Sequence, residues 1–340
     1  MKRLSLSKCA AAAALCAFSG AASADLTAAG TWTGNVGLSV DGIGSNLTPV
    51  GDVQAFVPVG ATILQAYLYS AGTPSPWYAQ SPTTLADYNG AGITLAGNVV
   101  SNFDTLVGAT STRADIGAWY TARADVTSLV QSLTAGAVTD SFAWSVGEGS
   151  LNNFIDGQVL AIVYEHASLA LGSVALLDGG QNTGGETTFV QLGSPLMDPT
   201  DPSFAAQLGL GISFSCCGQS STIEVNGSMV TDTAGNFNDG LQASDGSLIT
   251  VGGIGDDPSN NLGYDVDDEL YDLSPFLSEG DMSFSIFTQN PTNDDNIFFA
   301  SLYLTGEITD IRPGIPEPET YALMLAGLAL VGAAARRRRR

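Results

Sequence analysis

An internal repeat sets the strongest limit on how this chain can fold. Four stretches of the first half recur in the second half, in the same order and 137 to 147 residues further on. A repeat of this length is the size of a domain, and two copies are too few for a solenoid. We therefore expect two similar units in tandem. The matching pairs are Tyr88–Gly90 with Val225–Gly227, Asp125–Val130 with Asp272–Leu277, Ser141–Val146 with Met282–Phe287, and Asp156–Tyr164 with Asp295–Tyr303.

The apolar runs within each copy are short and are bounded by Gly, Ser, Thr, Asn and Asp, which favour turns. Segments such as Ser283–Phe287 alternate between polar and apolar residues, as a strand with one buried face does. The pattern predicts an all-β fold of two tandem β-sandwich, jelly-roll-like units, over residues 25–170 and 171–311. The expected elements include a strand at Thr31–Val40, an Asn-Gly turn at Tyr88–Gly90 and a helix at Val126–Leu133.

Both ends of the chain resemble export signals. Basic residues, the apolar run Cys9–Phe18 and the small residues before Asp25 predict a signal peptide over residues 1–24, cut by signal peptidase between Ala24 and Asp25. At the other end, Pro316, Glu317 and Pro318 form a stiff segment that no helix absorbs. An apolar stretch, Tyr321–Ala335, follows and predicts a short transmembrane helix. The chain then ends in the basic cluster Arg336, Arg337, Arg338, Arg339 and Arg340, which favours the cytoplasmic side.

This C-terminal arrangement, placed at residues 312–340, resembles the PEP-CTERM sorting signal of Gram-negative bacteria. The resemblance implies that an exosortase in the inner membrane recognises the chain and removes the helix. It also implies a transient membrane anchor, followed by release to the cell surface or the extracellular matrix. Proteins with this signal are associated with exopolysaccharide and biofilm. An ordinary C-terminal membrane anchor is the plainer interpretation of the same residues.

A second resemblance covers about residues 50–180. These residues are similar to a domain of unknown function found in surface proteins, the DUF3344-like group. The resemblance implies a β-sandwich and supplies no activity. The residues that carry it are Ala66–Tyr69, Tyr88–Gly90, Ala124–Val130, Asp156–Glu165 and Val174–Gly179.

The predicted mature chain is strongly acidic. Three of the 11 basic residues lie in the signal peptide and five in the terminal cluster, which leaves Arg113, Arg123 and Arg312 and no lysine. Of the 34 acidic residues, only Glu317 and Glu319 lie in the tail, so the segment 25–315 carries a net charge of about −29. Nucleic acid is excluded as a partner, because nothing would neutralise its phosphates.

Acidic residues of the second half are candidate calcium ligands, since calcium prefers carboxylate and carbonyl oxygens on loops. No EF-hand pattern is present, and a solvated acidic loop is the alternative interpretation. The candidate ligands are Asp256, Asp257, Asp265, Asp267, Asp268 and Glu269.

Two further pairs of residues are candidates for special roles. Trp77 and Tyr78, in a Pro-rich stretch, are candidate glycan contacts, although aromatic residues are as often part of a core. Cys216 and Cys217 either form a vicinal disulfide in the oxidising periplasm or remain free.

We expect no enzyme. His166 is the one histidine, and no Gly-x-Ser-x-Gly motif accompanies it. The sequence predicts an exported structural or adhesive protein of the cell surface or matrix. The first alternative is a calcium-assisted carbohydrate-binding module. An extracellular glycoside hydrolase is less favoured. Among this many carboxylates some pair lies at catalytic spacing by chance, so such a pair is no evidence of catalysis.

Overall fold

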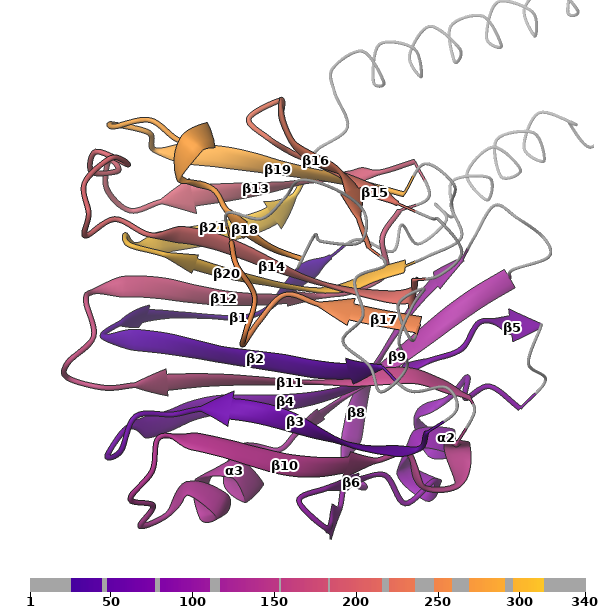
Figure 1. Cartoon of the computed structure of the whole chain (residues 1–340). Helices are drawn as coiled ribbons and strands as arrows, with labels where there is room; N and C mark the ends of the chain where they lie inside the picture. Colours follow the sequence, from indigo (N-terminus) through magenta and orange to yellow (C-terminus); the bar gives the residue numbers. More distant parts are fainter. Residues whose placement is uncertain are drawn as a thin grey trace, which may run out of the picture.

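In the computed structural model, the strands form four antiparallel sheets that are stacked in layers (Figure 1). The predicted all-β fold is confirmed. The described residues are 26–44, 48–76, 80–110, 117–152, 154–182, 184–215, 220–235, 248–258, 269–290 and 296–314.

Sheets A and B are the two inner layers. Sheet A contains, in order across the sheet, β1 (Thr27–Gly34), β12 (Gly172–Asp178), β20 (Asn296–Leu304), β14 (Ala206–Ser215) and β17 (Leu248–Val251), with β18 (Leu270–Asp272) also paired to β14. Sheet B contains β2 (Val36–Gly44), β11 (Ile155–Glu165), β4 (Thr62–Gly72), β9 (Gly117–Asp125) and β5 (Ser75–Pro76), with β8 (Phe103–Thr110) also paired to β9.

Sheets C and D are the outer layers. Sheet C contains β3 (Val50–Phe56), β10 (Ser141–Gly147), β6 (Thr94–Leu95) and β7 (Asn98–Val99). Sheet D contains β16 (Ser228–Ala234), β15 (Ser221–Val225), β19 (Ser283–Gln289), β13 (Glu186–Leu192) and β21 (Ile308–Pro313). Within the described residues, the helical elements are α2 (Leu85–Gly90), α3 (Thr127–Thr134), and the 3-10 turns η1 (Gly149–Leu151) and η2 (Ser274–Phe276).

Three apolar layers separate the four sheets. One core lies between sheets B and C, and a second lies between sheets A and D. The third, with Val159, Leu176 and Phe298, joins sheet A to sheet B. The central strand β11 of sheet B is therefore buried on both faces, which explains its continuous apolar run. The outer strand β19 alternates between buried and partly exposed residues, as the sequence predicts.

The two sandwiches share one strand order. In sheet B the order β2-β11-β4-β9 corresponds to β12-β20-β14-β18 in sheet A, and β3-β10-β6-β7 in sheet C corresponds to β13-β19-β15-β16 in sheet D. Local contacts are also repeated. The N–H of Thr127 donates to Asp125 Oδ1 at 2.9 Å, and the N–H of Ser274 donates to Asp272 Oδ1 at 2.9 Å. The helix predicted at Val126–Leu133 is confirmed as α3.

Two local expectations are wrong. The Asn-Gly turn expected at Tyr88–Gly90 is instead the end of helix α2, which begins with a capping box of Thr84 and Asp87. The turn that matches Asn226–Gly227 is Ala96–Gly97, with φ angles of 50° and 75° against 52° and 74°.

The strand expected at Thr31–Val40 is two strands in different sheets. The chain leaves β1 in sheet A at Gly34, whose φ of 148° favours glycine, and enters β2 in sheet B at Val36. β1 thus belongs to the second sandwich although it comes first in the chain. The domain boundary near residue 170 stays a prediction.

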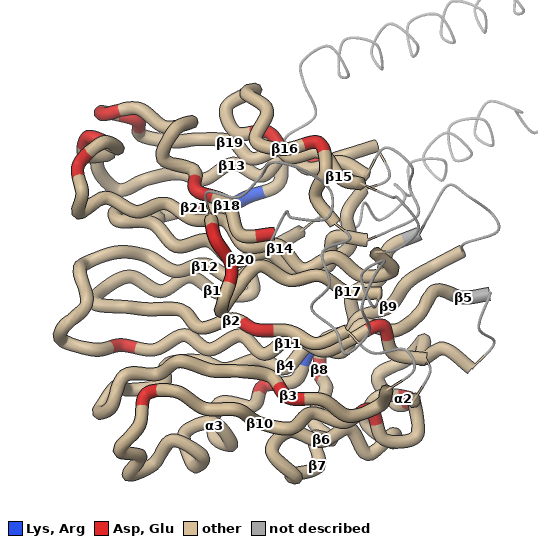
Figure 2. The backbone as a smooth tube through the Cα atoms, in the orientation of Figure 1, with Lys and Arg blue, Asp and Glu red and all other residues tan. Residues whose placement is uncertain are grey.

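A buried ion pair also joins the inner sheets. Arg123 of β9 donates through Nη1 to Asp178 of β12, and through Nη2 to Thr105 Oγ1 at 2.9 Å. The hydroxyl of Tyr69 donates to Asp178 Oδ2 at 3.2 Å. The guanidinium lies 4.6 Å from the centre of the Tyr67 ring. Figure 2 shows how few basic residues the described chain has among its many acidic ones; they are Arg123 and Arg312.

Candidate functional site: a groove between the inner sheets

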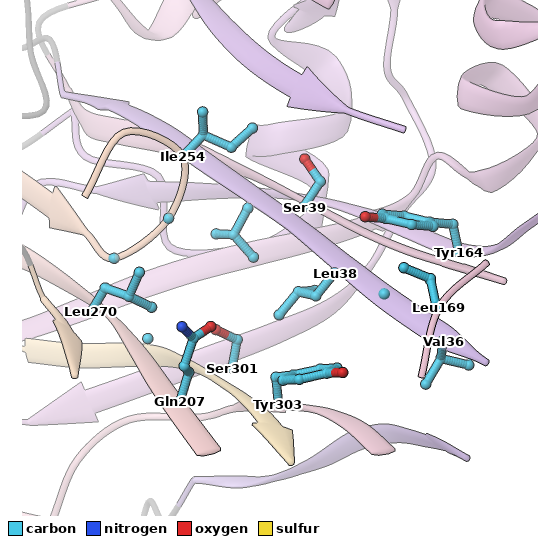
Figure 3. A pocket seen from close by; sticks show the side chains of 15 residues that line it. Val36, Leu38, Ser39, Tyr164, Leu169, Gln207, Ile254, Leu270, Ser301 and Tyr303 are labelled. Carbon is cyan, nitrogen blue, oxygen red and sulfur yellow. The ribbon is translucent and has the colours of Figure 1, made fainter. Parts of the chain in front are cut away.

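A groove of about 300 Å³ opens between sheet A and the edge strand β2 of sheet B (Figure 3). Its volume is at the lower end of the range of small-ligand sites, about 300 to 1,000 Å³. From sheet A come Gln207, Ser301 and Tyr303, and from sheet B come Ser39 and Tyr164. The remaining lining is aliphatic or glycine, including Leu38, Leu169, Ile254 and Leu270.

Glycines let the backbone segments of the groove approach one another. A Cβ on Gly252 would lie 2.0 Å from the backbone oxygen of Glu269, and one on Gly253 would lie 2.2 Å from that of Val40. The N–H of Ile254 donates to the Val40 oxygen at 2.9 Å. The loop after β17 is thereby fixed against β2 and forms one wall of the groove.

Tyr164 and Tyr303 lie near the ends of β11 and β20 and are aligned in the sequence repeat, but they are not equivalent in the structure. Tyr164 is 4% exposed and belongs to the core between sheets B and C, whereas Tyr303 packs against the core between sheets A and B. Burial raises the pKa of Tyr164, and the nearby Tyr303 raises it further. Burial also raises the pKa of Tyr303, although a hydrogen bond with Thr305 lowers this pKa in part. Both phenols therefore stay neutral at physiological pH, where they can donate and accept hydrogen bonds.

No charged side chain lies among the described residues that line the groove. The side chains present are two phenols, a primary amide, two hydroxyls and aliphatic groups. Ser39 Oγ already accepts a hydrogen bond from the N–H of Phe56 at 3.0 Å, and Tyr164 and Ser301 are only 4% and 3% exposed. The polar groups most available to a ligand therefore belong to Gln207 and Tyr303. This lining suits an uncharged molecule with hydroxyl groups and apolar faces.

Two of the three candidate calcium ligands that the structure describes, Glu269 and Asp256, accept hydrogen bonds from the loops beside the groove. Glu269 is fully buried, and its carboxylate accepts hydrogen bonds from the N–H of Gly235, the hydroxyl of Thr250 and the hydroxyl of Tyr271 at 2.9, 3.2 and 2.7 Å. Asp256 Oδ2 accepts from the N–H of Gly253 at 2.5 Å. Asp257 is exposed.

The other candidate residues lie outside the described segments. They are Asp265, Asp267, Asp268, Trp77, Tyr78, Cys216, Cys217, Ala24, Asp25, Pro316, Glu317, Pro318 and Arg336 to Arg340. Within the part of the chain that is described, no group of three or more His, Cys, Asp or Glu side chains is arranged to hold a metal. The calcium, glycan-contact and disulfide roles of these residues stay predictions.

Another buried acidic residue was not singled out from the sequence. Asp156, at the start of β11, is 0% exposed. Burial raises the pKa of its carboxyl group well above the ordinary value. A hydrogen bond with the backbone of Phe214 lowers this pKa in part, and the charge of the neighbouring Glu148 raises it further. The carboxyl group of Asp156 is therefore stabilised in its protonated form.

Sequence reasoning also missed Tyr164 and Tyr303 as site residues. The repeat aligns the two tyrosines in sequence, but this is no signal for a shared site, because Tyr164 and Tyr303 lie on different faces of their sheets. Nothing in the alignment shows that the equivalent ends of two inner strands meet across one groove, since that depends on the packing of sheet A on sheet B.

Comparison with known proteins identifies only the end of the chain. Residues 314–340 match the PEP-CTERM protein-sorting motif. No curated protein and no solved structure matches the chain. The resemblance of residues 50–180 to a surface-protein module stays a prediction. No helix among the described segments is long and apolar enough to cross a membrane, and the helix expected at Tyr321–Ala335 lies outside them.

Proposed function

We propose that this chain has a structural or adhesive role in the exopolysaccharide matrix. It carries a PEP-CTERM sorting motif and is thereby a secreted exosortase substrate with a transient C-terminal membrane anchor. The groove between the inner sheets holds a neutral glycan segment of that matrix. Binding takes place without bond cleavage. The observation that carries the proposal is an uncharged groove with two tyrosines in a strongly acidic chain.

The chemistry of the groove supports a sugar. Pyranose rings present C–H groups on one face and hydroxyls at the edge, so aromatic faces and neutral hydrogen-bonding groups together match them. Tyr303 supplies aromatic surface and a hydroxyl, and Gln207 supplies both a donor and an acceptor. An acidic sugar would be repelled by the net negative charge of the chain.

The test is retention of the processed protein in gels that contain a neutral or an acidic polysaccharide. We expect retention by the neutral polymer, and a loss of about tenfold in affinity for Tyr303→Ala and for Gln207→Leu, which removes the amide at similar size. Phe189→Ala, on the outer face of sheet D where Phe189 is 41% exposed, is the matched control. Undiminished retention of both groove variants would contradict the assignment of the groove.

The same gels separate the alternatives. Retention that requires calcium and disappears with a chelator would support the calcium-assisted binding module. Shortening of the polymer during incubation would support the hydrolase instead. Self-association that grows with protein concentration, without retention, would leave a structural role that does not use the groove.

A further inference from the structure

The first sandwich has an open edge at the place where the second sandwich carries an additional strand. β13 of sheet D lies between β19 and β21, whereas its counterpart β3 in sheet C pairs with β10 alone (Figure 1). The connectivity explains the difference. The strand that follows β20 in the chain is β21, which pairs with β13, but the strand that follows β11 is β12, which belongs to sheet A. Within the described residues, no strand therefore lies beside the outer edge of β3.

Side chains of β2 take the place of that strand. The N–H of Gln54 donates to Asp41 Oδ2, and the N–H of Phe56 donates to Ser39 Oγ at 3.0 Å. Both N–H groups point away from β10, and Ser39 and Asp41 satisfy them from the neighbouring layer. We call these two side chains the edge cap. They protect backbone groups that would otherwise be free to pair with another chain.

A second copy of β3 matches this edge in one register. Backbone groups point outward at every second residue, which here means Val50, Asp52, Gln54 and Phe56. When two β3 strands run antiparallel about a twofold axis at Val53, Val50 lies opposite Phe56, and Asp52 lies opposite Gln54. Val50 and Phe56 are 57% and 43% exposed, so this register covers apolar surface twice and opposes no two carboxylates.

We propose that the outer edge of β3 is the surface through which this chain pairs with a second copy of itself, and that Ser39 and Asp41 keep this edge closed in the monomer. On pairing, the N–H of Gln54 exchanges Asp41 for the carbonyl oxygen of Asp52 in the second copy. The twofold arrangement closes with two copies. Asp41, Val50 and Phe56 do not line the groove, so pairing is independent of glycan binding.

The edge cap responds to pH through Asp41. Burial raises the pKa of Asp41 to about 6, although the N–H groups of Gln54 and Gly42 lower it in part. Pairing removes the N–H of Gln54 from the carboxylate, so it raises the pKa of Asp41 further and takes up a proton. Acid therefore favours pairing, and the edge cap is strongest above about pH 6.

No charge from the described elements around β2 contributes to this shift in the pKa of Asp41. The titratable residues of these elements are Asp52 of β3, Asp156, Tyr164 and Glu165 of β11, Asp178 of β12, and Asp256 and Asp257 after β17.

Sedimentation velocity of the processed protein at pH 7.5 and pH 5 tests the edge cap. We expect the wild type to associate about tenfold or more tightly at pH 5. Asp41→Ala should associate at both pH values and lose this pH dependence. Asp198→Ala is the matched control, because Asp198 also accepts a backbone N–H, from Thr200 at 2.9 Å, but lies in an exposed loop. It should behave as the wild type does.

A second set of variants tests the edge itself. Val50→Glu combined with Phe56→Glu places carboxylates opposite each other and should keep the protein monomeric at pH 5. Val138→Glu combined with Phe189→Glu, at residues that are 95% and 41% exposed elsewhere, should leave association unchanged. This comparison needs no change at Asp41, so it stands even where Asp41→Ala fails to fold. A wild type that stays monomeric at pH 5, or association that survives Val50→Glu with Phe56→Glu, would overturn the proposal.

Discussion

Replacing Arg123 by methionine tests whether the buried ion pair with Asp178 holds the inner sheets together. Methionine keeps much of the volume but leaves Asp178, whose side chain is 6% exposed, without its cation. Breaking a buried pair from one side costs about 3 to 5 kcal/mol. Because the Arg123 side chain keeps 16% exposure, we expect the lower end, about 3 kcal/mol of unfolding free energy at pH 8.

The same variant makes a prediction about pH. Burial raises the pKa of Asp178, and Arg123 and the Tyr69 hydroxyl lower it in part. Without Arg123 the pKa of Asp178 rises further. A carboxyl group with a higher pKa in the native state than in the unfolded state stabilises the fold below about pH 4, and this stability is lost as the pH rises through the native pKa. The cost of Arg123→Met should thus be smaller at pH 5 than at pH 8.

Urea unfolding of the processed protein, followed by tryptophan fluorescence, measures both effects. Arg312→Met is the matched control, because Arg312 and Asp310 are 57% and 53% exposed and 3.8 Å apart. Such surface pairs contribute about 0 to 1 kcal/mol. Arg123→Met combined with Asp178→Leu should recover most of the lost stability. A cost below about 1 kcal/mol at pH 8, or one that does not change with pH, would refute the reasoning.

Two further substitutions test the packing. Asp156→Asn removes a buried carboxyl group whose pKa is raised, and this raised pKa makes the native state lose stability as the pH rises above about 4. The melting temperature of the variant should therefore increase relative to that of the wild type between pH 5 and pH 8. A difference in melting temperature that stays constant over this range would contradict the prediction. Gly252→Ala places a Cβ 2.0 Å from the backbone oxygen of Glu269 and should cost about 2 kcal/mol or more, whereas Gly90→Ala, with open space around it, should stay within about 0.5 kcal/mol. Thermal unfolding of both glycine variants checks the contrast, and equal melting temperatures would contradict it.

The fold class could be read from the sequence because each layer leaves its own pattern. The run Val159–Val163 is continuously apolar, and its strand β11 is covered on both faces. Ser283–Phe287 alternates, and its strand β19 lies in an outer sheet. Strands β8 and β9 were not foreseen, since their sequences include Gly108, Asp104 and Arg123 and show no clear period. Arg123 is accommodated there because its partner Asp178 comes from another sheet.

Sequence periodicity cannot tell which sheet a strand joins. Only Asn35 separates β1 from β2 in the chain, and the break between the two strands depends on Gly34 and on a corner at Asn35. There the side chain of Asn35 donates to the Leu169 oxygen at 2.6 Å, and the Asn35 oxygen accepts from the N–H of His166 at 2.9 Å. These partners are more than 130 residues away in the chain, so no local pattern indicates them.

The groove also depends on contacts between distant parts of the chain, so it could not be predicted from the sequence. The same contacts explain how the two copies of the repeat form one site. Each copy contributes an inner sheet, and the two inner sheets pack on each other through Tyr69, Val163 and Phe299 among others. Equivalent faces of the two inner sheets therefore face one another. Tyr303 lies on this shared face, whereas Tyr164 belongs to the other face of sheet B and only borders the same groove. Neither sandwich has this site alone, because one wall belongs to β2 and the other to β14 and β20. Binding at the groove and docking of the two sandwiches are consequently linked, so a ligand held there stabilises the interface that forms its site.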